Sequence, residues 1–420
     1  MDVNELLLGV DCKCGKKHTC NIKHVYIEAG ACKRLVEICA QYSKILIVAD
    51  QNTFGVAGKG VESALSGKIA NKVIFDGDKI LIPNEQAIER VEKDLKDIDL
   101  IVGIGSGVIQ DLCKYVSFDK GVPYIIVATA PSMDGYASTG AAMILGGMKV
   151  TVSAGLPLAI VADVDVLKNA PMEMIKSGYG DIIGKYSSLN DWKLSNVVTG
   201  EYFCQYIYDV TYQMIEKTKA LAQGVVKRDA ESIKVLMEAL TVVGIMMSFA
   251  TTSRPASGSE HHLSHFFEIV GIVRGEEYFP HGIDVAYSTI ETALIREKLL
   301  KQSFNKQNFR DDKSVLEQKI KAIYGEEVGL GCIKLHEKLK TYATDRQKIY
   351  VEKEQEIKKI LSEMPSASEV ESILSVVGYD KKDFFALYGE QKIKDAIVYA
   401  KDLKDRYTVL WLNYDINGEN

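Results

Sequence analysis

The sequence predicts a parallel α/β domain followed by an all-helical domain. Short apolar, β-branched runs alternate with helix-like segments as far as about residue 162. From Pro171 onward these strand patterns stop, and apolar residues recur three and four positions apart. A chain of 420 residues is also too long for one simple core. We therefore expect two domains, a nucleotide-binding α/β domain at residues 1–168 and a helical metal- and substrate-binding domain at residues 169–420.

Four apolar runs predict strands that are buried on both faces. They cover residues 44–49, 73–75, 100–102 and 124–128. Helices are predicted between them at residues 84–97, capped by Asn84, and at residues 108–118. Strands that alternate with helices are typical of a doubly wound parallel sheet.

The pattern changes after Ser138. Gly146-Gly147 predicts a hairpin turn between strands at residues 141–145 and 149–152. One more apolar strand is expected at residues 158–162. Further along, Lys/Glu pairs at helical spacing predict exposed helix faces, most clearly at residues 336–364.

Composition favours a protein that acts on small molecules. The net charge is −6, and acidic and basic residues are spread along the chain, so there is no basic stripe for a nucleic acid. No window approaches the roughly 18 uninterrupted apolar residues of a membrane span, and no export signal is visible. We expect a cytoplasmic protein without a nucleic-acid partner or a membrane span. The eight cysteines are then expected to be reduced thiols.

Four of the seven histidines fall between positions 261 and 281. Gly258 and Ser259 predict a helix start with Ser259 as N-cap, which would place His261 and His265 on one face. Such a pair is often only a satisfied surface or core pair. Asp181 favours a metal site over that interpretation. Together with His261 and His281 it makes a three-ligand set that leaves coordination positions free, as in catalytic metal sites. Asp181 is expected in a turn of small residues, 177–185, that opens an apolar helix.

A second motif is the glycine turn at residues 103–107, between a strand and a helix. Small residues there let backbone amides approach a pyrophosphate at the helix N-terminus. Asp50 ends an earlier strand and can accept hydrogen bonds from a ribose, and a turn at residues 129–134 ends another strand on the same edge. Asp50 precedes the glycines, so the usual dinucleotide fingerprint is not matched, and Asp50 is alternatively a turn residue.

The N-terminal segment holds a third candidate site. Cys12, Cys14 and Cys20 surround His18. The spacing is not the usual pair of Cys-x-x-Cys arms. A structural zinc site and a plain β-turn rich in thiols are both open readings of these residues.

Several of these segments resemble the sn-glycerol-1-phosphate dehydrogenases, closest to the bacterial arabinose-operon type within the dehydroquinate synthase and iron-dependent alcohol dehydrogenase superfamily. The resemblance covers nearly the whole chain. Its residues are Val48-Ala49-Asp50, the glycine turn at 103–107, Pro131-Ser132-Met133-Asp134-Gly135, Gly180-Asp181, the block at 253–261, Pro280-His281-Gly282, and the C-terminal segments 392–396 and 405–410. One departure is Gly282-Ile283, where some members of the superfamily have Gly-Glu.

The resemblance implies a role for individual residues. Asp181, His261 and His281 would bind one divalent metal, nickel in the bacterial type or zinc in archaeal relatives. The implied catalytic residues, which touch substrate, are Asp134, Asp181 and His265. The implied site of NAD(H) or NADP(H) is lined by Asp50, Gly105, Ser106, Gly107, Val108, Ile109, Thr129 and Ser138. The resemblance also implies a homodimer with a role in phospholipid biosynthesis.

The implied reaction is reduction of dihydroxyacetone phosphate to sn-glycerol 1-phosphate, with NADH preferred because Asp50 would repel the extra phosphate of NADPH. A metal would polarise the ketone, and His265 would take part in proton transfer. Arg254 and Lys185 are candidates for binding the phosphate, although Arg254 alternatively serves as a structural ion-pair partner. Rival hypotheses are a dehydrogenase for glycerol or another uncharged polyol, a dehydroquinate synthase, and a nucleotide-sensing protein with a structural metal. A dehydroquinate synthase would have Glu rather than Asp as first ligand.

Overall fold

The computed structural model describes residues 3–78, 81–146, 148–305, 309 and 312–419. The chain divides into two compact units. Unit 1 comprises Met1–Ile182 and Glu216–Ser253, and unit 2 comprises Ile183–Ile215 and Arg254–Asn420. The domain boundary expected at residue 168 remains a prediction, and the two units are described separately below.

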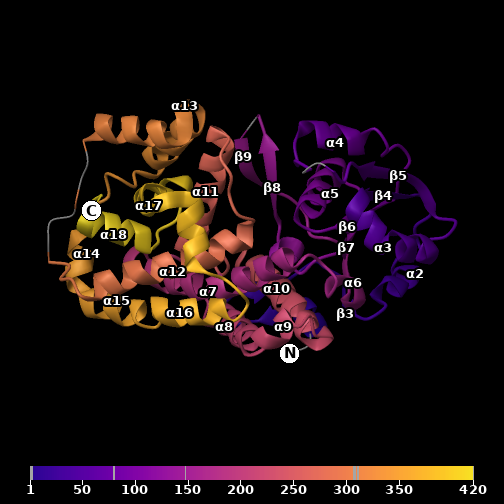
Figure 1. Cartoon of the computed structure of the whole chain (residues 1–420), viewed down its shortest axis with the longest axis horizontal. Helices are drawn as coiled ribbons and strands as arrows, with labels where there is room; N and C mark the ends of the chain where they lie inside the picture. Colours follow the sequence, from indigo (N-terminus) through magenta and orange to yellow (C-terminus); the bar gives the residue numbers. More distant parts are fainter. Residues whose placement is uncertain (1–2, 79–80, 147, 306–308, 310–311, 420) are drawn as a thin grey trace. The chain divides into compact units, whose positions relative to one another are not determined.

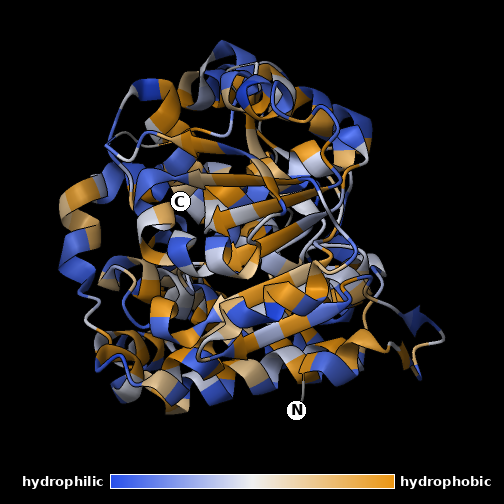
Figure 2. Cartoon of the chain, turned by 90° about the vertical axis from the view of Figure 1, so that its right-hand side faces the viewer, coloured by the Kyte–Doolittle hydropathy of each residue, from blue (hydrophilic) through white to orange (hydrophobic). Residues whose placement is uncertain are grey.

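Unit 1 is built on a six-stranded sheet in which every neighbouring pair is parallel (Figure 1). Figure 2 shows that its strands are predominantly apolar. The central strands are buried, as their uninterrupted apolar sequences require. In spatial order the strands are β3 (His24–Glu28), β10 (Ala159–Asp163), β7 (Tyr124–Ala128), β6 (Leu100–Gly105), β4 (Ile45–Asp50) and β5 (Ile69–Phe75).

The predicted parallel sheet is confirmed, and it has one strand more than predicted. All five predicted strands of this sheet are present, β5 being longer than expected. The additional strand is β3, which pairs with β10 at the edge of the sheet. Its residues alternate between buried and half-buried, with His24, Tyr26 and Glu28 on the half-buried face. A five-residue edge strand with polar residues lacks the continuous apolar run that identified the others.

Helices and two hairpins complete unit 1. Asn84 caps α4 as predicted, its side-chain oxygen accepting the Ala87 N–H at 3.1 Å, but α4 ends at Glu92 rather than near Asp97. Gly147 of the predicted hairpin turn lies outside the described residues. The helices are α1 (Val3–Leu7), η1 (Ala31–Arg34), α2 (Leu35–Ile38), α3 (Gln51–Ala64), α4 (Glu85–Glu92), α5 (Gly107–Lys120), η2 (Gly135–Ala137), α6 (Val164–Leu167), α9 (Ala222–Val226) and α10 (Ala230–Ala250), and the hairpins pair β1 (Val10–Asp11) with β2 (Lys17–His18) and β8 (Gly140–Leu145) with β9 (Met148–Ser153).

Helix α10 is the most apolar long helix of unit 1. By length and composition alone it could cross a membrane, but 78% of its most apolar window is buried inside the protein. Core helices commonly pass the same test. At Gly244 a Cβ atom would lie 2.7 Å from the Asp134 carbonyl oxygen, so glycine lets α10 pack directly against η2.

Two helices contribute residues to both units. Helix α7 (Met172–Thr199) groups with unit 1 through Ile182 and with unit 2 from Ile183, and α8 (Gln205–Ala220) passes from unit 2 to unit 1 at Glu216. The turn predicted at residues 177–185 is therefore wrong, because this segment is the interior of α7. Its glycines serve close packing. A Cβ on Gly178 would lie 1.8 Å from the Pro131 carbonyl oxygen, and one on Gly184 would lie 2.5 Å from Val285 Cγ1.

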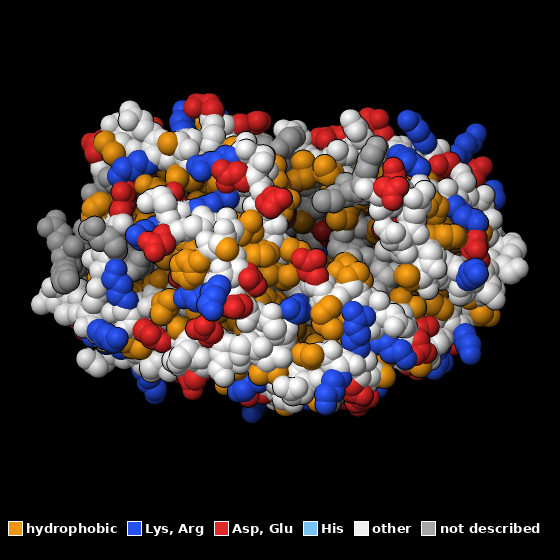
Figure 3. All heavy atoms as spheres, viewed as in Figure 1, with side chains coloured by type: hydrophobic (Ala, Val, Ile, Leu, Met, Phe, Trp, Pro, Cys, Tyr) orange, Lys and Arg blue, Asp and Glu red, His pale blue; other side chains and the backbone are white. Residues whose placement is uncertain are grey.

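Unit 2 is helical, with no strand among its described residues, which confirms the predicted helical C-terminal region. Helices α11 and α12 pack against each other. Figure 3 shows Lys and Arg interspersed with Asp and Glu over the described part of the viewed face. The remaining helices of this unit are α11 (Ser259–Arg274), α12 (His281–Leu300), α13 (Lys313–Leu339), α14 (Gln347–Glu352), α15 (Glu354–Leu361), α16 (Ala367–Ser375), α17 (Lys381–Tyr399), η3 (Ala400–Leu403) and α18 (Val409–Asn417).

Candidate active site

Helix α11 begins one residue earlier than predicted. Gly258 is its N-cap, and Ser259 is the first helical residue rather than the cap. The Ser259 N–H donates to Asp191 Oδ2 at 2.6 Å, and the Gly258 N–H donates to Glu260 Oε1 at 2.9 Å. A Cβ on Gly258 would lie 2.7 Å from Asp191 Oδ2. Carboxylates from within and outside the helix thus occupy its N-terminus, where free N–H groups favour negative charge.

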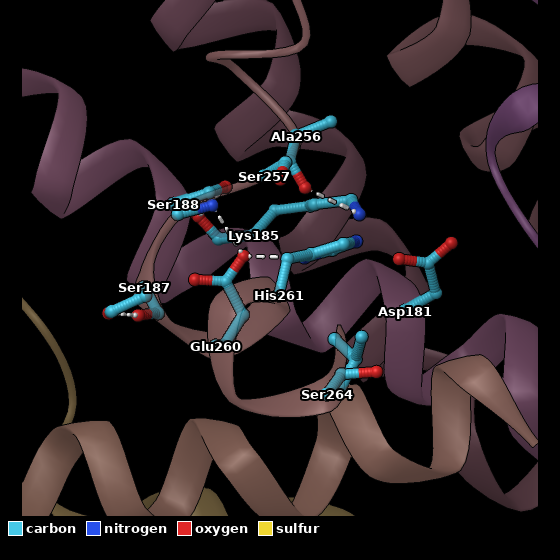
Figure 4. A network of polar contacts seen from close by, with 12 residues as sticks. Asp181, Lys185, Ser187, Ser188, Ala256, Ser257, Glu260, His261 and Ser264 are labelled. Carbon is cyan, nitrogen blue, oxygen red and sulfur yellow. Dashed lines mark hydrogen bonds and ion pairs between the residues drawn. The ribbon is translucent and has the colours of Figure 1, made fainter. Parts of the chain in front are cut away.

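His261 is held by its neighbour Glu260. Its Nδ1 lies 2.7 Å from Glu260 Oε1, and both side chains are buried. Burial is the largest single influence and would raise the pKa of Glu260, but the hydrogen bond and charge of His261, the Gly258 N–H and Lys185 together lower that pKa. The resulting carboxylate can only accept, so Nδ1 carries the proton and Nε2 keeps its lone pair for a ligand. Figure 4 shows the Glu260 carboxylate beside the His261 ring.

His281 is oriented in a similar way by a serine. It is the first residue of α12, and its Nδ1 lies 3.3 Å from Ser264 Oγ. Because Ser264 Oγ donates to the His281 carbonyl oxygen at 3.2 Å, it accepts from Nδ1 and leaves Nε2 for a ligand. Ser264 was not predicted from the sequence, although it lies three residues after His261 and therefore on the same helical face.

His265 lies beside this pair as predicted. The ring centroid of His281 is 5.0 Å from that of His261 and 5.3 Å from that of His265. His265 is half-buried. His262, by contrast, is fully buried on another face of α11. The three remaining histidines of the motif therefore gather at one place.

Asp181 completes the predicted ligand set. It is fully buried on α7, and its Oδ2 accepts the Asp134 N–H at 3.0 Å. The close approach permitted by Gly178, together with a 3.0 Å bond from Ser177 Oγ to the Ser132 carbonyl, brings the Asp134 segment to this helix. One potential ligand atom from each of Asp181, His261 and His281 lies within 4.8 Å of the others. Two imidazoles and one carboxylate fit a divalent ion such as zinc or nickel with coordination positions left open.

The predicted nucleotide motifs lie at the carboxyl edge of the sheet in unit 1. The chain leaves β4 for β5 on one side and then returns to β6 on the other, so β4 and β6 flank a point where the strand order reverses. Ligands of open α/β sheets bind at such points. Asp50 and Gly105 end these two strands, and the Thr129 N–H donates to the Gly105 carbonyl oxygen at 3.1 Å.

The start of α5 has the features of an anion site. A Cβ on Gly105 would lie 2.6 Å from Ile109 Cβ, so glycine is needed where β6 enters the helix, whereas nothing lies within 4 Å of one on Gly107. Ser106 is the N-cap but makes no side-chain capping hydrogen bond within the described residues. The N–H groups of Gly107, Val108 and Ile109 precede the first helical carbonyl partners, as phosphate-binding helix termini require.

Asp50 is the N-cap of a helix and not the turn residue that was its alternative, because α3 begins at Gln51. Its Oδ1 accepts the N–H groups of Asn52 at 2.8 Å and Thr53 at 2.9 Å, so it caps α3. Both hydrogen bonds use the same oxygen, and the side chain is half-buried. A ribose contact would use the other carboxylate oxygen, Oδ2. That contact stays a prediction.

Lys114 on α5 anchors a segment that carries one of the predicted cofactor-binding residues, and this was not predicted from the sequence. Its fully buried Nζ lies 2.9 Å from the Gly135 carbonyl oxygen, 2.8 Å from that of Gly140 and 3.4 Å from Ser138 Oγ. It thereby fixes the segment that carries Ser138. Burial lowers the pKa of Lys114. A lysine on the inward face of an amphipathic helix was the available signal.

The two phosphate candidates are both engaged by protein groups. Arg254 is 1% exposed and donates to Glu201 through Nε at 2.8 Å and Nη2 at 2.6 Å, which is its alternative ion-pair role. Lys185 Nζ donates to the Ala256 carbonyl oxygen at 3.0 Å. The roles predicted for Asp134, His265 and the cofactor-binding residues remain predictions, now with a position for each.

The amino-acid sequence is similar to those of known dehydrogenases. The family model for iron-containing alcohol dehydrogenases matches residues 26–171. A glycerol-1-phosphate dehydrogenase [NAD(P)+] of Geobacillus thermodenitrificans is 33% identical over 297 residues, which cover 68% of this chain and 72% of that protein. The protein of the same name from Halalkalibacterium halodurans is 28% identical over 409 residues, covering 96% of this chain and 94% of that one.

A solved structure extends the likeness to the whole fold. Sulfoacetaldehyde reductase from Bifidobacterium kashiwanohense, in complex with NAD+, superimposes with a TM-score of 0.61 at 12% identity. The match covers 94% of this chain and 97% of that chain. At this identity the likeness shows the fold alone. The fold of that enzyme likewise includes both a sheet region and a helical region.

Proposed function

Because the chain belongs to the glycerol-1-phosphate dehydrogenase family, we propose that it reduces dihydroxyacetone phosphate to sn-glycerol 1-phosphate with NADH. At the coarser level it is an NAD(P)-dependent dehydrogenase of a polyol phosphate. The observation that carries the finer proposal is the open ligand set of Asp181, His261 and His281, whose ligand atoms lie within 4.8 Å of one another.

In the proposed reaction, hydride passes from the nicotinamide ring to the ketone carbon and a proton is added to the ketone oxygen. Asp181, His261 and His281 would hold a nickel or zinc ion, which when bound supplies positive charge for that oxygen. Glu260 and Ser264 orient the two imidazoles before substrate arrives, so little rearrangement is needed.

His265 is the proposed route for the proton. Its ring lies beside that of His281, and the side chain is half-buried, so it can contact both substrate and solvent. An imidazole suits proton transfer near neutral pH. Asp134 is proposed to hold a substrate hydroxyl, since its backbone is anchored to Asp181 by the 3.0 Å hydrogen bond.

The proposed cofactor site joins the start of α5 to the end of β4. The N-terminal amides of α5 would bind the pyrophosphate, and the free carboxylate oxygen of Asp50 would accept from the ribose. Thr129 and Ser138 border this region through their contacts with Gly105 and Lys114. We further propose a cytoplasmic homodimer that serves phospholipid biosynthesis, as the sequence resemblance implies.

One observation favours a second candidate, a dehydrogenase for glycerol or another uncharged polyol. Arg254 is bound to Glu201 and to the Tyr407 carbonyl oxygen. The guanidinium group of Arg254 is thus already bound to other protein groups. A substrate phosphate would have to be recognised by other residues.

A kinetic comparison separates the two candidates. NADH oxidation by the purified protein is measured with dihydroxyacetone phosphate and with dihydroxyacetone, each over a range of concentrations. We expect kcat/KM to be higher for the phosphate ester by at least two orders of magnitude, roughly 3 kcal/mol, and the product to be the sn-1 enantiomer. Equal values would support the polyol dehydrogenase, and no turnover of either substrate would support a nucleotide-binding protein.

A further inference from the structure

A second group of metal-ligating side chains lies in the N-terminal hairpin, outside the proposed active site. The turn between β1 and β2 is closed by two backbone hydrogen bonds, from the Cys12 N–H to the Lys16 carbonyl at 3.1 Å and from the Gly15 N–H to the Cys12 carbonyl at 3.0 Å. Gly15 has φ of 87°, a conformation that glycine adopts without strain. The hairpin therefore holds Cys12 and Cys14 in its turn and His18 on the returning strand.

His18 is oriented as a metal ligand would be. The side chain is 1% exposed, and Nδ1 lies 3.0 Å from the Phe249 carbonyl oxygen. Because a carbonyl only accepts, Nδ1 carries the proton and Nε2 presents its lone pair. That Nε2 lies 3.4 Å from Cys14 Sγ. A backbone carbonyl that fixes the tautomer of an imidazole is a common outer partner at metal sites.

Cys204 supplies a third sulfur atom. It is fully buried directly before α8, and its Sγ lies within 4.8 Å of the ligand atoms of Cys12, Cys14 and His18. Cys20 was the third cysteine expected from the sequence. Cys20 is not part of this group, its thiol being buried with a raised pKa caused first by that burial. Three thiols and one imidazole are a complete tetrahedral donor set.

We propose that Cys12, Cys14, His18 and Cys204 bind one structural zinc ion. For zinc–sulfur and zinc–nitrogen bonds of about 2.3 and 2.05 Å, a tetrahedron has a sulfur-to-nitrogen edge of roughly 3.6 Å. The observed Cys14-to-His18 separation of 3.4 Å is close to that edge. Four protein ligands leave no open position, so the ion stabilises the fold and takes no part in the reaction. On binding, each thiol releases its proton to solvent and the thiolate sulfur donates to the metal.

The rival interpretation is a turn rich in thiols without a metal. In that case Cys14 donates an S–H hydrogen bond to His18 Nε2, and the three thiols stay protonated. The same residues could also be joined by oxidation, but all eight cysteines are outside disulfides in the structure. The two interpretations differ in metal content and in the protonation of sulfur, both of which can be measured.

Cobalt substitution tests the proposal on the unaltered full-length chain. The purified protein is stripped of metal, reloaded with Co²⁺ and examined by absorption spectroscopy. We expect a thiolate-to-cobalt charge-transfer band in the near ultraviolet and the visible bands of tetrahedral Co²⁺. A spectrum without the charge-transfer band overturns the proposal whatever the behaviour of any variant.

Matched variants then assign the band. Cys204→Ser and Cys14→Ser should each lose it together with one zinc equivalent per chain, while Cys20→Ser, a buried thiol outside the group, should keep both. His281→Ala should keep the band, which separates this site from the proposed active site. If His281→Ala loses all bound metal, or if Cys204→Ser folds and keeps the band, the group does not bind zinc. Loss of NADH-dependent activity with the band intact would instead concern the proposed function alone.

Discussion

The two groups of candidate ligands differ in both number and chemical type. Asp181, His261 and His281 offer one oxygen and two nitrogens, whereas Cys12, Cys14, His18 and Cys204 offer three sulfurs and one nitrogen. The first set leaves positions for a substrate, and the second is closed. On our proposals, ligand count separates the site of chemistry from the site of structural support, and the softer sulfur donors accompany the proposed structural role.

The hydrogen-bond partners of His261 and His18 also differ between the two ligand sets. His261 Nδ1 faces a carboxylate, Glu260, while His18 Nδ1 faces the neutral carbonyl of Phe249. A carboxylate makes the imidazole more basic and adds negative charge beside the ion. A backbone carbonyl fixes the ring without adding charge. The first arrangement strengthens donation from His261 to a bound metal, and the second only orients the His18 ring.

Removing one ligand from the open set should have the largest effect. We expect His281→Ala to lower kcat/KM for dihydroxyacetone phosphate by about 10³-fold or more. With only two of its three protein ligands left, the site should no longer hold the metal. Metal analysis should show loss of one equivalent, while the cobalt–thiolate band of the closed set persists. Full activity in this variant would contradict the assignment of the open set.

His265→Ala should have the next largest effect. The variant should retain its metal and lose turnover by about 10²–10⁴-fold, the usual contribution of a positioned acid or base. Steady-state kinetics and metal content are measured on the same preparation. If metal and activity are lost in step, His265 is itself a ligand, and the open set is larger than proposed.

Much of the fold could be predicted because strands of a buried parallel sheet are continuous apolar runs. Strand β3 was missed because an edge strand alternates in burial, and its His24, Tyr26 and Glu28 weaken the apolar signal. The turn expected around Asp181 shows a different limit. Small residues mark both chain reversals and close helix packing, and only the structure shows that Gly178 faces the Pro131 carbonyl.

The ligand sets were predictable to different degrees for a related reason. Asp181, His261 and His281 lie in motifs whose neighbours already indicate a site. Cys204 has no such neighbours, and its place beside Cys14 depends on tertiary packing that no local pattern encodes. Cys20 is nearer in sequence, but it is not among the four residues whose ligand atoms lie within 4.8 Å of one another.

A smaller change probes the partner of His261 instead of a ligand. Glu260→Gln preserves the shape of the side chain but removes its charge, so we expect metal affinity to fall by about 10–100-fold. Metal competition with a chelator gives the dissociation constant directly. Ser264→Ala, which removes the neutral partner of His281, should have a weaker effect, and equal affinities in Glu260→Gln and the unaltered protein would show that the carboxylate charge is not used.

The smallest expected change leaves both ligand sets intact. Asp50→Ser keeps an N-cap for α3, since serine also caps helices, but it removes the charge that disfavours NADPH. We expect the NADH preference to narrow by roughly ten-fold, about 1.4 kcal/mol, mainly through KM. Catalytic efficiencies with both cofactors decide it. Equal efficiencies in the unaltered enzyme would mean that Asp50 acts only as the cap of α3.

The distance along the chain between His18 and Phe249 has a consequence for biosynthesis. These two residues are 231 positions apart, and β3 pairs with β10 more than a hundred residues later. A ribosome that adds roughly 5–20 residues per second needs about 12–46 s to cover the interval. The thiols of Cys12 and Cys14 are therefore translated well before Cys204 and the carbonyl of Phe249, so the β1–β2 hairpin waits for much of the chain before it can reach its final surroundings.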